Sequence, residues 1–133
     1  MAIEVVNIHS RLKINRNNLK RLIKKIVEKL NLEIEDIGIV LVDDEYIKEL
    51  NKRYRKIDSS TDVLSFSMEE DKIWGDIYIS LDTAARQAQL QGWDLEQEVR
   101  FLAVHGLLHL IGYDDETEEG YNEMMSLTNE LLI

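Results

Sequence analysis

Two histidines stand four residues apart in the segment HGLLHLIGYDDE, which runs from His105 to Glu116. On a helix this spacing places both imidazoles on one face, roughly 6 Å apart at Cβ, where one metal ion can take a nitrogen from each. Two imidazoles without partners are costly to bury in a segment as apolar as this one. The spacing therefore favours a metal site over two ordinary core histidines.

A third ligand is expected shortly after the second histidine. Gly112 is suited to end the helix and turn the chain back, and Asp115, six residues after His109, can then reach the same ion. Asp114 is the competing ligand. Asp115 also has the pattern of a capping box with Glu118 for the last helix, and a carboxylate with two oxygens can fill both roles. We favour Asp115 as the ligand.

The residue after His105 is Gly106, where HExxH metalloproteases carry the glutamate that acts as general base. Its absence counts against peptide hydrolysis. We expect the glycine to leave room beside the ion for a bulky substrate. Phosphodiester cleavage fits the remaining groups, because it can proceed with a metal ion and a cation that stabilises the developing charge.

Composition narrows the setting of this site. The 133 residues suggest one domain, residues 1–133, and the lack of cysteine leaves only nitrogen and oxygen ligands for a metal. No signal-peptide pattern or membrane-length apolar run is seen, so we expect a cytoplasmic protein that does not contact membranes. The net charge of -10 argues weakly against a nucleic-acid partner, but residues 1–56 carry +4 and residues 57–133 carry -14. This division allows an anionic substrate to bind on one side of the metal.

Hydrophobic periodicity predicts an α+β fold in which a small, mixed, four-stranded sheet packs with about five helices. The central buried helix carries the metal ligands, because residues 94–111 are apolar on several sides. In the second helix, Tyr46, Ile47, Leu50 and Tyr54 are expected to face inward. We expect strands at 2–8, 37–42, 61–67 and 74–80, and helices at about 15–30, 43–55, 80–92, 94–111 and 116–131.

Three segments resemble one known family. HGLLHLIGYDD, His105 to Asp115, resembles the HGxLHLxGYDH signature of the YbeY family, which are bacterial single-strand-specific endoribonucleases of ribosomal RNA maturation. LNKRYRKIDSSTDVLSFS, Leu50 to Ser67, resembles the family block LNxxYRxxDxPTDVLSFP, and GDIYIS, Gly75 to Ser80, matches a third. The blocks keep the family's order and spacing over essentially the whole chain.

The resemblance implies a divalent ion, usually zinc, held by His105, His109 and the residue at position 115. It implies that Arg55 is the functional arginine near the metal, and a guanidinium can pair bidentately with a phosphodiester. The alternative for Arg55 is a helix-end residue paired with Asp58. Asp115 is a departure from the family pattern, which has a third histidine there. Ser60 and Ser67 replace typical prolines.

The implied function is metal-dependent cleavage of single-stranded ribosomal RNA precursors, including maturation of the 16S rRNA 3′ end, and ribosome quality control. Ribosomal proteins are a further partner class. The nucleophile is a water activated by the ion or an internal 2′-OH. Two alternatives are a metal-dependent hydrolase of another substrate, suggested by the protease-like histidine spacing, and a non-catalytic ribosome-assembly adaptor in which the metal ties down the last helix. His9 is far from the motif in the sequence, and we expect it to be a surface residue.

Overall fold

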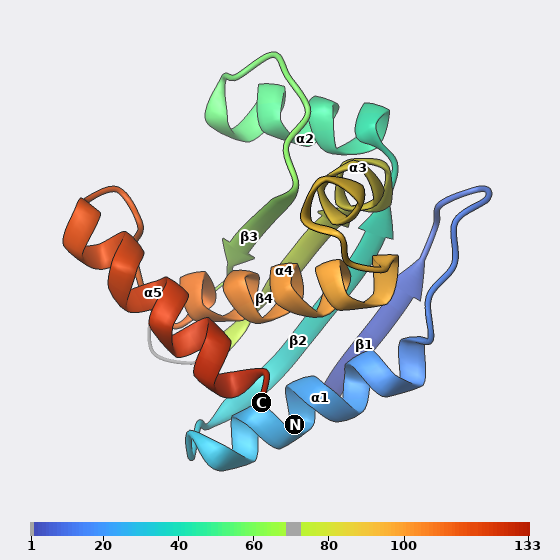
Figure 1. Cartoon of the computed structure of the whole chain (residues 1–133). Coiled ribbons are helices and arrows are strands. Elements are labelled where there is room, and N and C mark those ends of the chain that lie inside the picture. The colour runs from blue at the N-terminus through green and yellow to red at the C-terminus, as the bar shows by residue number, and fades with distance from the viewer. Residues whose placement is uncertain (1, 69–72) are drawn as a thin grey trace.

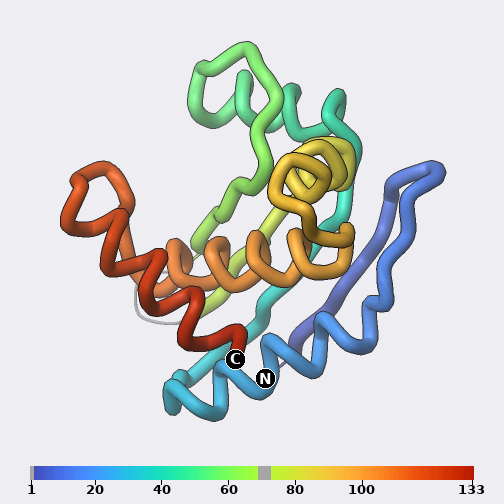
Figure 2. Tube along the Cα trace, in the orientation of Figure 1, coloured from blue at the N-terminus to red at the C-terminus, as the bar shows by residue number. Residues whose placement is uncertain are grey.

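Four strands form one mixed sheet that is packed with five helices, within residues 2–68 and 73–133, which the computed structural model describes (Figures 1 and 2). The predicted α+β class and the mixed four-stranded sheet are confirmed. No helix in these ranges is long and apolar enough to cross a bilayer. The elements in chain order are β1 (Ala2–Asn7), α1 (Arg16–Lys29), β2 (Ile34–Val42), α2 (Asp44–Arg55), β3 (Val63–Ser67), β4 (Ile73–Ser80), α3 (Leu81–Gln91), α4 (Leu95–Leu110) and α5 (Glu118–Leu131).

The sheet has the order β1-β2-β4-β3, in which β1, β2 and β4 are parallel and β3 runs antiparallel to β4. The run around Ile39 is apolar on both faces, as expected for a strand with a parallel neighbour on each side. Side chains alternate between the faces, so Ile77 and Ile79 of β4 join one cluster of buried residues while Tyr78 joins the other. One face therefore carries the larger cluster and the other face a smaller one.

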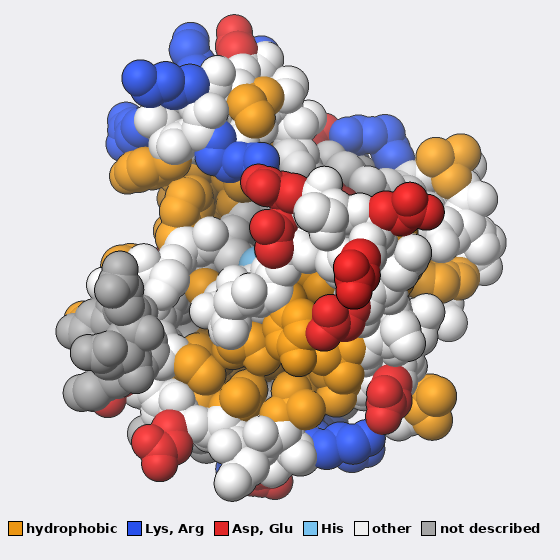
Figure 3. Space-filling view, turned by 90° about the vertical axis from the view of Figure 1, so that its left-hand side faces the viewer, with side chains coloured by type: hydrophobic (Ala, Val, Ile, Leu, Met, Phe, Trp, Pro, Cys, Tyr) orange, Lys and Arg blue, Asp and Glu red, His pale blue; other side chains and the backbone are white. Residues whose placement is uncertain are grey.

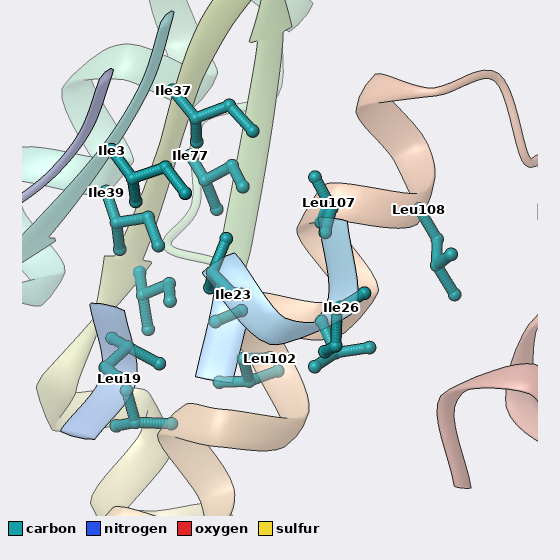
Figure 4. Close-up of a cluster of buried hydrophobic side chains, with 14 of the residues drawn as sticks. Ile3, Leu19, Ile23, Ile26, Ile37, Ile39, Ile77, Leu102, Leu107 and Leu108 are labelled. Atoms are coloured by element: carbon teal, nitrogen blue, oxygen red, sulfur yellow. The ribbon is translucent and has the colours of Figure 1, made fainter. Parts of the chain in front are cut away.

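The larger core lies between the sheet and the helices α1 and α4 (Figure 4). Leu19, Ile23 and Ile26 of α1 are buried at the helical spacing that the sequence shows, and they meet Ile39 of β2 and Leu102 of α4 in the same cluster. This contact places α4 across the strands, as Figure 1 shows. The predicted central helix is confirmed, since its buried side chains belong to this core.

The helix α2 covers the opposite face of the sheet, and only part of its predicted inner face is buried. Ile47 is fully buried, but Tyr46 and Tyr54 are 42% and 60% exposed, so the prediction that both tyrosines face inward was wrong. Tyr46 stacks on Tyr78 with ring centroids 6.1 Å apart, and Tyr54 meets Phe66 edge-on at 5.2 Å. The tyrosines lie along the border of the interface because α2 covers only one end of this face.

The start of α4 is fixed by the predicted capping box. Asp94 accepts the N–H of Gln97 at 2.8 Å, and the Gln97 side chain accepts the N–H of Asp94 at 2.9 Å. Gly92 ends α3 in the left-handed region with φ 72°, as predicted. These two ends determine where α3 stops and where α4 begins.

His9 is buried, with 6% of its surface exposed, so the prediction of a surface residue was wrong. Its Nδ1 accepts the backbone N–H groups of Arg11 and Leu12, each at 3.0 Å, so Nε2 carries the proton and donates to Asp82 at 2.8 Å. The other oxygen of Asp82 accepts the N–H of Asp44 at 3.0 Å. One imidazole thus joins the loop after β1 to the first turns of α2 and α3.

Asp44 extends this polar network. Its carboxylate accepts from the hydroxyls of Ser80 and Thr83, both at 2.6 Å, and from Arg86 at 2.8 Å. Burial alone would raise the pKa of Asp44, but these donors outweigh burial and lower the pKa below its ordinary value of 3.8. The pKa of Asp82 is also lowered, because the bonds from His9 and from the Asp44 N–H outweigh the effect of burial.

These two carboxylates predict an acid-sensitive fold. A lowered pKa in the folded state stabilises the protein above the unfolded-state pKa near 3.8, and this stability is lost as the pH falls through the lower folded-state values. We expect Asp82→Ala to lower the free energy of unfolding at pH 7 by roughly 1 to 3 kcal/mol, because the buried His9 donor loses its acceptor. Its stability should also fall less steeply below pH 4 than that of the wild type. Urea denaturation between pH 2.5 and pH 7 measures both effects.

Asp58→Ala is the control, because the Asp58 side chain is 64% exposed. It should leave the stability at pH 7 nearly unchanged. An Asp82→Ala curve that runs parallel to the wild-type curve at every pH would show that Asp82 contributes nothing to the acid transition.

Candidate metal centre

His105 and His109 lie one turn apart on α4 and point the same way, with ring centroids 5.1 Å apart. Asp115 joins them from the segment between α4 and α5. Its Oδ2 atom is 3.5 Å from Nε2 of His105 and 3.6 Å from Nε2 of His109. The structure thus brings together the three residues that the sequence proposes as ligands, with one ligand atom of each within 4.8 Å of the others.

These distances suit an ion between the three groups. Tetrahedral zinc, with bonds of about 2.0 to 2.1 Å to nitrogen and oxygen, separates its ligand atoms by roughly 3.4 Å. A direct hydrogen bond between imidazole and carboxylate would be about 2.7 to 2.9 Å. The two His–Asp distances, 3.5 and 3.6 Å, lie near the first value. The cluster can therefore hold a metal ion, and three protein ligands leave one position of a tetrahedron open.

Asp115 reaches the histidines because the chain reverses at Gly112, which has φ 107°. The Gly112 N–H donates to His109 O at 3.1 Å, and the Tyr113 N–H donates to Leu108 O at 3.0 Å. These bonds pair two backbone carbonyls in the last turn of α4. A side chain at position 112 would be strained at this φ. The predicted glycine turn is confirmed.

The sequence allows two alternatives to Asp115 as a ligand in this segment: Asp115 as a helix cap, and Asp114 as the ligand. The helix α5 is capped by Thr117, whose hydroxyl accepts the Gly120 N–H at 3.0 Å, so the capping box predicted for Asp115 was wrong. Asp114, the competing ligand, accepts the Glu116 N–H at 2.9 Å and closes a turn. Asp115 makes no capping bond, and its carboxylate faces the two histidines.

The three candidate ligands differ in how far their side chains are exposed to solvent. The side chains of His105, His109 and Asp115 are 12%, 31% and 36% exposed. The Nδ1 atom of His105 is buried without a hydrogen-bond partner, and the ring stacks on Phe101 at 5.8 Å and 15°. Packing therefore orients the His105 ring, and Nε2 is the nitrogen that can bind a ligand.

Gly106 faces the sheet, which corrects the expectation that it leaves room for substrate beside the ion. A Cβ there would lie 2.6 Å from Cγ2 of Ile77 and 3.1 Å from Oγ of Ser65. The Ser65 hydroxyl donates to Gly106 O at 2.9 Å. The residue is glycine because α4 approaches β3 and β4 closely, and a glutamate at this position would collide with β4.

Arg55, at the end of α2, lines the same cleft as the three candidate ligands. The alternative pairing with Asp58 is not found, because Asp58 lies 3.9 Å from Lys48. Within residues 2–68 and 73–133, Arg55 makes no ion pair or hydrogen bond. Lys56, with φ 58°, turns the chain after α2, and Asn51 donates to Ser59 O at 2.9 Å and anchors the loop that follows. The guanidinium is therefore available to a ligand.

The cleft has a volume of about 1080 Å³ and runs between α2, β3, α3, α4 and α5. Figure 3 shows Lys and Arg side chains gathered over α2 at the top of the molecule, with Asp and Glu side chains and one histidine below them. On this face, the cations of α2 therefore lie beside the acidic side chains that border the cleft.

Glu98 is a buried acid in this cleft that the sequence reading did not single out. It lies seven residues before His105 and therefore on the same face of α4. Burial raises its pKa, and the nearby charge of Asp62 raises it further. The signal was present in the sequence as three polar positions, 98, 105 and 109, that share one face of the helix.

Comparison with known proteins places this architecture in one family. A model of the family described as Endoribonuclease YbeY matches residues 4–133. The solution structure of TM1509 from Thermotoga maritima has a TM-score of 0.67 and 29% identity, covering 97% of this chain and 88% of that one.

Relatives with much higher identity carry the same description. The Endoribonuclease YbeY of Heliobacterium modesticaldum is 44% identical over 131 residues, which cover 86% of this chain and 79% of that protein. The Endoribonuclease YbeY of Desulforamulus reducens is 43% identical over 135 residues, which cover 90% and 87%. From the matched length and this identity, the chain belongs to the endoribonuclease YbeY family.

Proposed function

We propose that this protein is a metal-dependent endoribonuclease that cleaves single-stranded regions of ribosomal RNA precursors in the cytoplasm. Its tasks would include maturation of the 16S rRNA 3′ end and ribosome quality control. One observation carries the proposal: Arg55, which has no partner in the described residues, lines the same cleft as His105, His109 and Asp115. The names of the relatives support the same activity.

Zinc is the ion that we propose for the cluster of His105, His109 and Asp115. Two imidazole nitrogens and one carboxylate oxygen, with one position open, make up the donor set of many catalytic zinc sites. A bound divalent ion supplies Lewis-acid chemistry, because it polarises a phosphate oxygen and lowers the pKa of a water molecule. The carboxylate would shift the preference towards harder ions relative to three histidines.

The role we assign to Arg55 is to bind the scissile phosphate and to stabilise the charge that it gains. A guanidinium stays protonated at any physiological pH and can donate two parallel hydrogen bonds to phosphate oxygens. Arg55 is exposed, so it must give up little existing bonding to do so. Either a water or the 2′-OH can be the nucleophile, and a 2′,3′-cyclic phosphate on the product would identify the 2′-OH.

A second candidate function is the non-catalytic ribosome-assembly adaptor, with ribosomal proteins as partners. The observation that favours it is the position of Asp115 just before α5, because an ion bound there would tie α5 to α4. Peptide hydrolysis is disfavoured further by the structure. Position 106 faces the sheet, so a general base could not be accommodated there without moving β4.

Zinc binding tests the ligand set. We expect Asp115→Ala to weaken zinc binding by at least about tenfold, since loss of even an outer-sphere partner costs tenfold or more. Asp115→His should retain binding, because imidazole is also a zinc ligand. Isothermal titration of the apo protein with zinc measures both, and Asp114→Ala is the matched control that should bind as the wild type does. Wild-type affinity in Asp115→Ala would show that this carboxylate is not a ligand.

Cleavage of a single-stranded ribosomal RNA fragment tests the role of Arg55. We expect Arg55→Ala to lower the rate by roughly a hundredfold to a thousandfold, the usual effect of losing one donor to a developing negative charge. Its zinc content should not change. Arg53→Ala, in the same exposed turn of α2 but outside the cleft, is the control and should cleave normally.

Two outcomes would count against this assignment. Equal rates in Arg55→Ala and the wild type would remove Arg55 from the mechanism. Absence of cleavage by either protein, with retained binding to ribosomal particles, would favour the adaptor function.

A further inference from the structure

The cleft continues past the candidate metal centre towards the start of α4, and aromatic rings line this part. His105 stacks on Phe101 at 5.8 Å and 15°, and Phe101 meets Trp93 edge-on at 5.8 Å and 64°. His105 therefore occupies one face of Phe101. Phe101 is the one ring that Trp93 contacts in the described part of the chain, and both residues line the cleft. The indole is the ring that can accept a further planar group.

A polar edge lies beside these rings. The Gln91 Nε2 atom donates to Oε2 of Glu98 at 3.4 Å, and Glu98 is 1% exposed whereas Gln91 is exposed. The buried carboxyl thus holds the amide with Nε2 directed inward. Oε1 of Gln91 then points the other way, and no residue in the described ranges donates to it. The cleft presents an oriented hydrogen-bond acceptor next to an indole.

We propose that this end of the cleft binds one unpaired nucleobase, which stacks on Trp93 and donates from an exocyclic amino group to Oε1 of Gln91. Stacking on aromatic side chains and hydrogen bonding at the base edge are the usual means of recognising single-stranded RNA. The site is continuous with the candidate metal centre through Phe101 and His105. The inference rests on the proposed function for its substrate class.

The oriented amide determines which base fits. Cytosine presents an amino group at C4, whereas uracil presents an oxygen acceptor there. A glutamine that can rotate would serve both bases. The hydrogen bond to Glu98 disfavours that rotation, and in the unrotated state uracil O4 would oppose Oε1 of Gln91 and leave two acceptors unpaired. Glu98 is therefore a positioning residue for base selection, and it acts through Gln91.

The first test measures stacking. Fluorescein-labelled 2′-O-methyl octamers of cytidine and of uridine are titrated with the protein, and fluorescence anisotropy gives the affinity of each. Trp93→Ala should weaken binding of both octamers by roughly tenfold, and Trp93→Phe should restore part of the loss. Trp74→Ala is the matched control, because Trp74 is 40% exposed on β4 and does not line the cleft. Wild-type affinity in Trp93→Ala would overturn the proposal.

The second test measures base selection. Wild type should bind the cytidine octamer about twofold to tenfold more tightly than the uridine octamer, the usual value of one hydrogen bond. Glu98→Met fills the buried position without an acceptor. In this variant the ratio of the affinity for the cytidine octamer to that for the uridine octamer should approach one, while the affinity for the uridine octamer is kept. Equal affinities in the wild type, or a proportional loss of both affinities in Glu98→Met, would contradict the positioning role.

These octamers separate this inference from the proposed function, because anisotropy measures binding without requiring cleavage. If ribosomal RNA is not cleaved but the octamers show the expected pattern, the endoribonuclease proposal fails and the base site stands. If RNA is cleaved but Trp93→Ala and Glu98→Met bind both octamers as the wild type does, the base site is refuted alone.

Discussion

The close approach of α4 to β3 and β4 at Gly106 determines the rest of the site. With no side chain at this position, the helix backbone packs directly against Ile77 and accepts a hydrogen bond from Ser65. Positions 98, 105 and 109 are then turned by roughly 60° to 100° about the helix axis from position 106. That rotation places Glu98, both histidines and their partners in the cleft while the remaining faces of α4 stay in the core.

We expect the binding of RNA by this protein to depend on the metal, because of the charges that line the cleft. Arg55 lines one part of the cleft, and Asp114, Asp115 and Glu116 line another. Without an ion, the acidic side would repel a phosphate. A divalent ion held by one carboxylate and two neutral imidazoles would reverse the local sign to a net +1. Such an ion would let a protein with a net charge of -10 bind an anion in this cleft.

The sequence predicted what depends on local spacing. The four-stranded sheet, the buried helix, the cap at Asp94 and the turn at Gly112 all follow from periodicity and backbone chemistry, and the structure confirms them. Long-range contacts were not predictable. His9 pairs with Asp82, which is 73 residues away, and no local pattern marks that bond. The role of Gly106 depends on which strand lies beside it, and the exposure of Tyr54 depends on how much of the sheet α2 covers.

We expect His105, His109 and Asp115 to hold one ion in the cleft that Arg55 also lines. Anomalous diffraction at the zinc edge, from crystals of the zinc-loaded protein, locates this ion. We expect one strong peak about 2.0 to 2.2 Å from Nε2 of both histidines and from a carboxylate oxygen of Asp115, with a fourth position open to solvent. A peak bound by Asp114 in place of Asp115, or a zinc ion bound away from the histidine pair, would contradict the account.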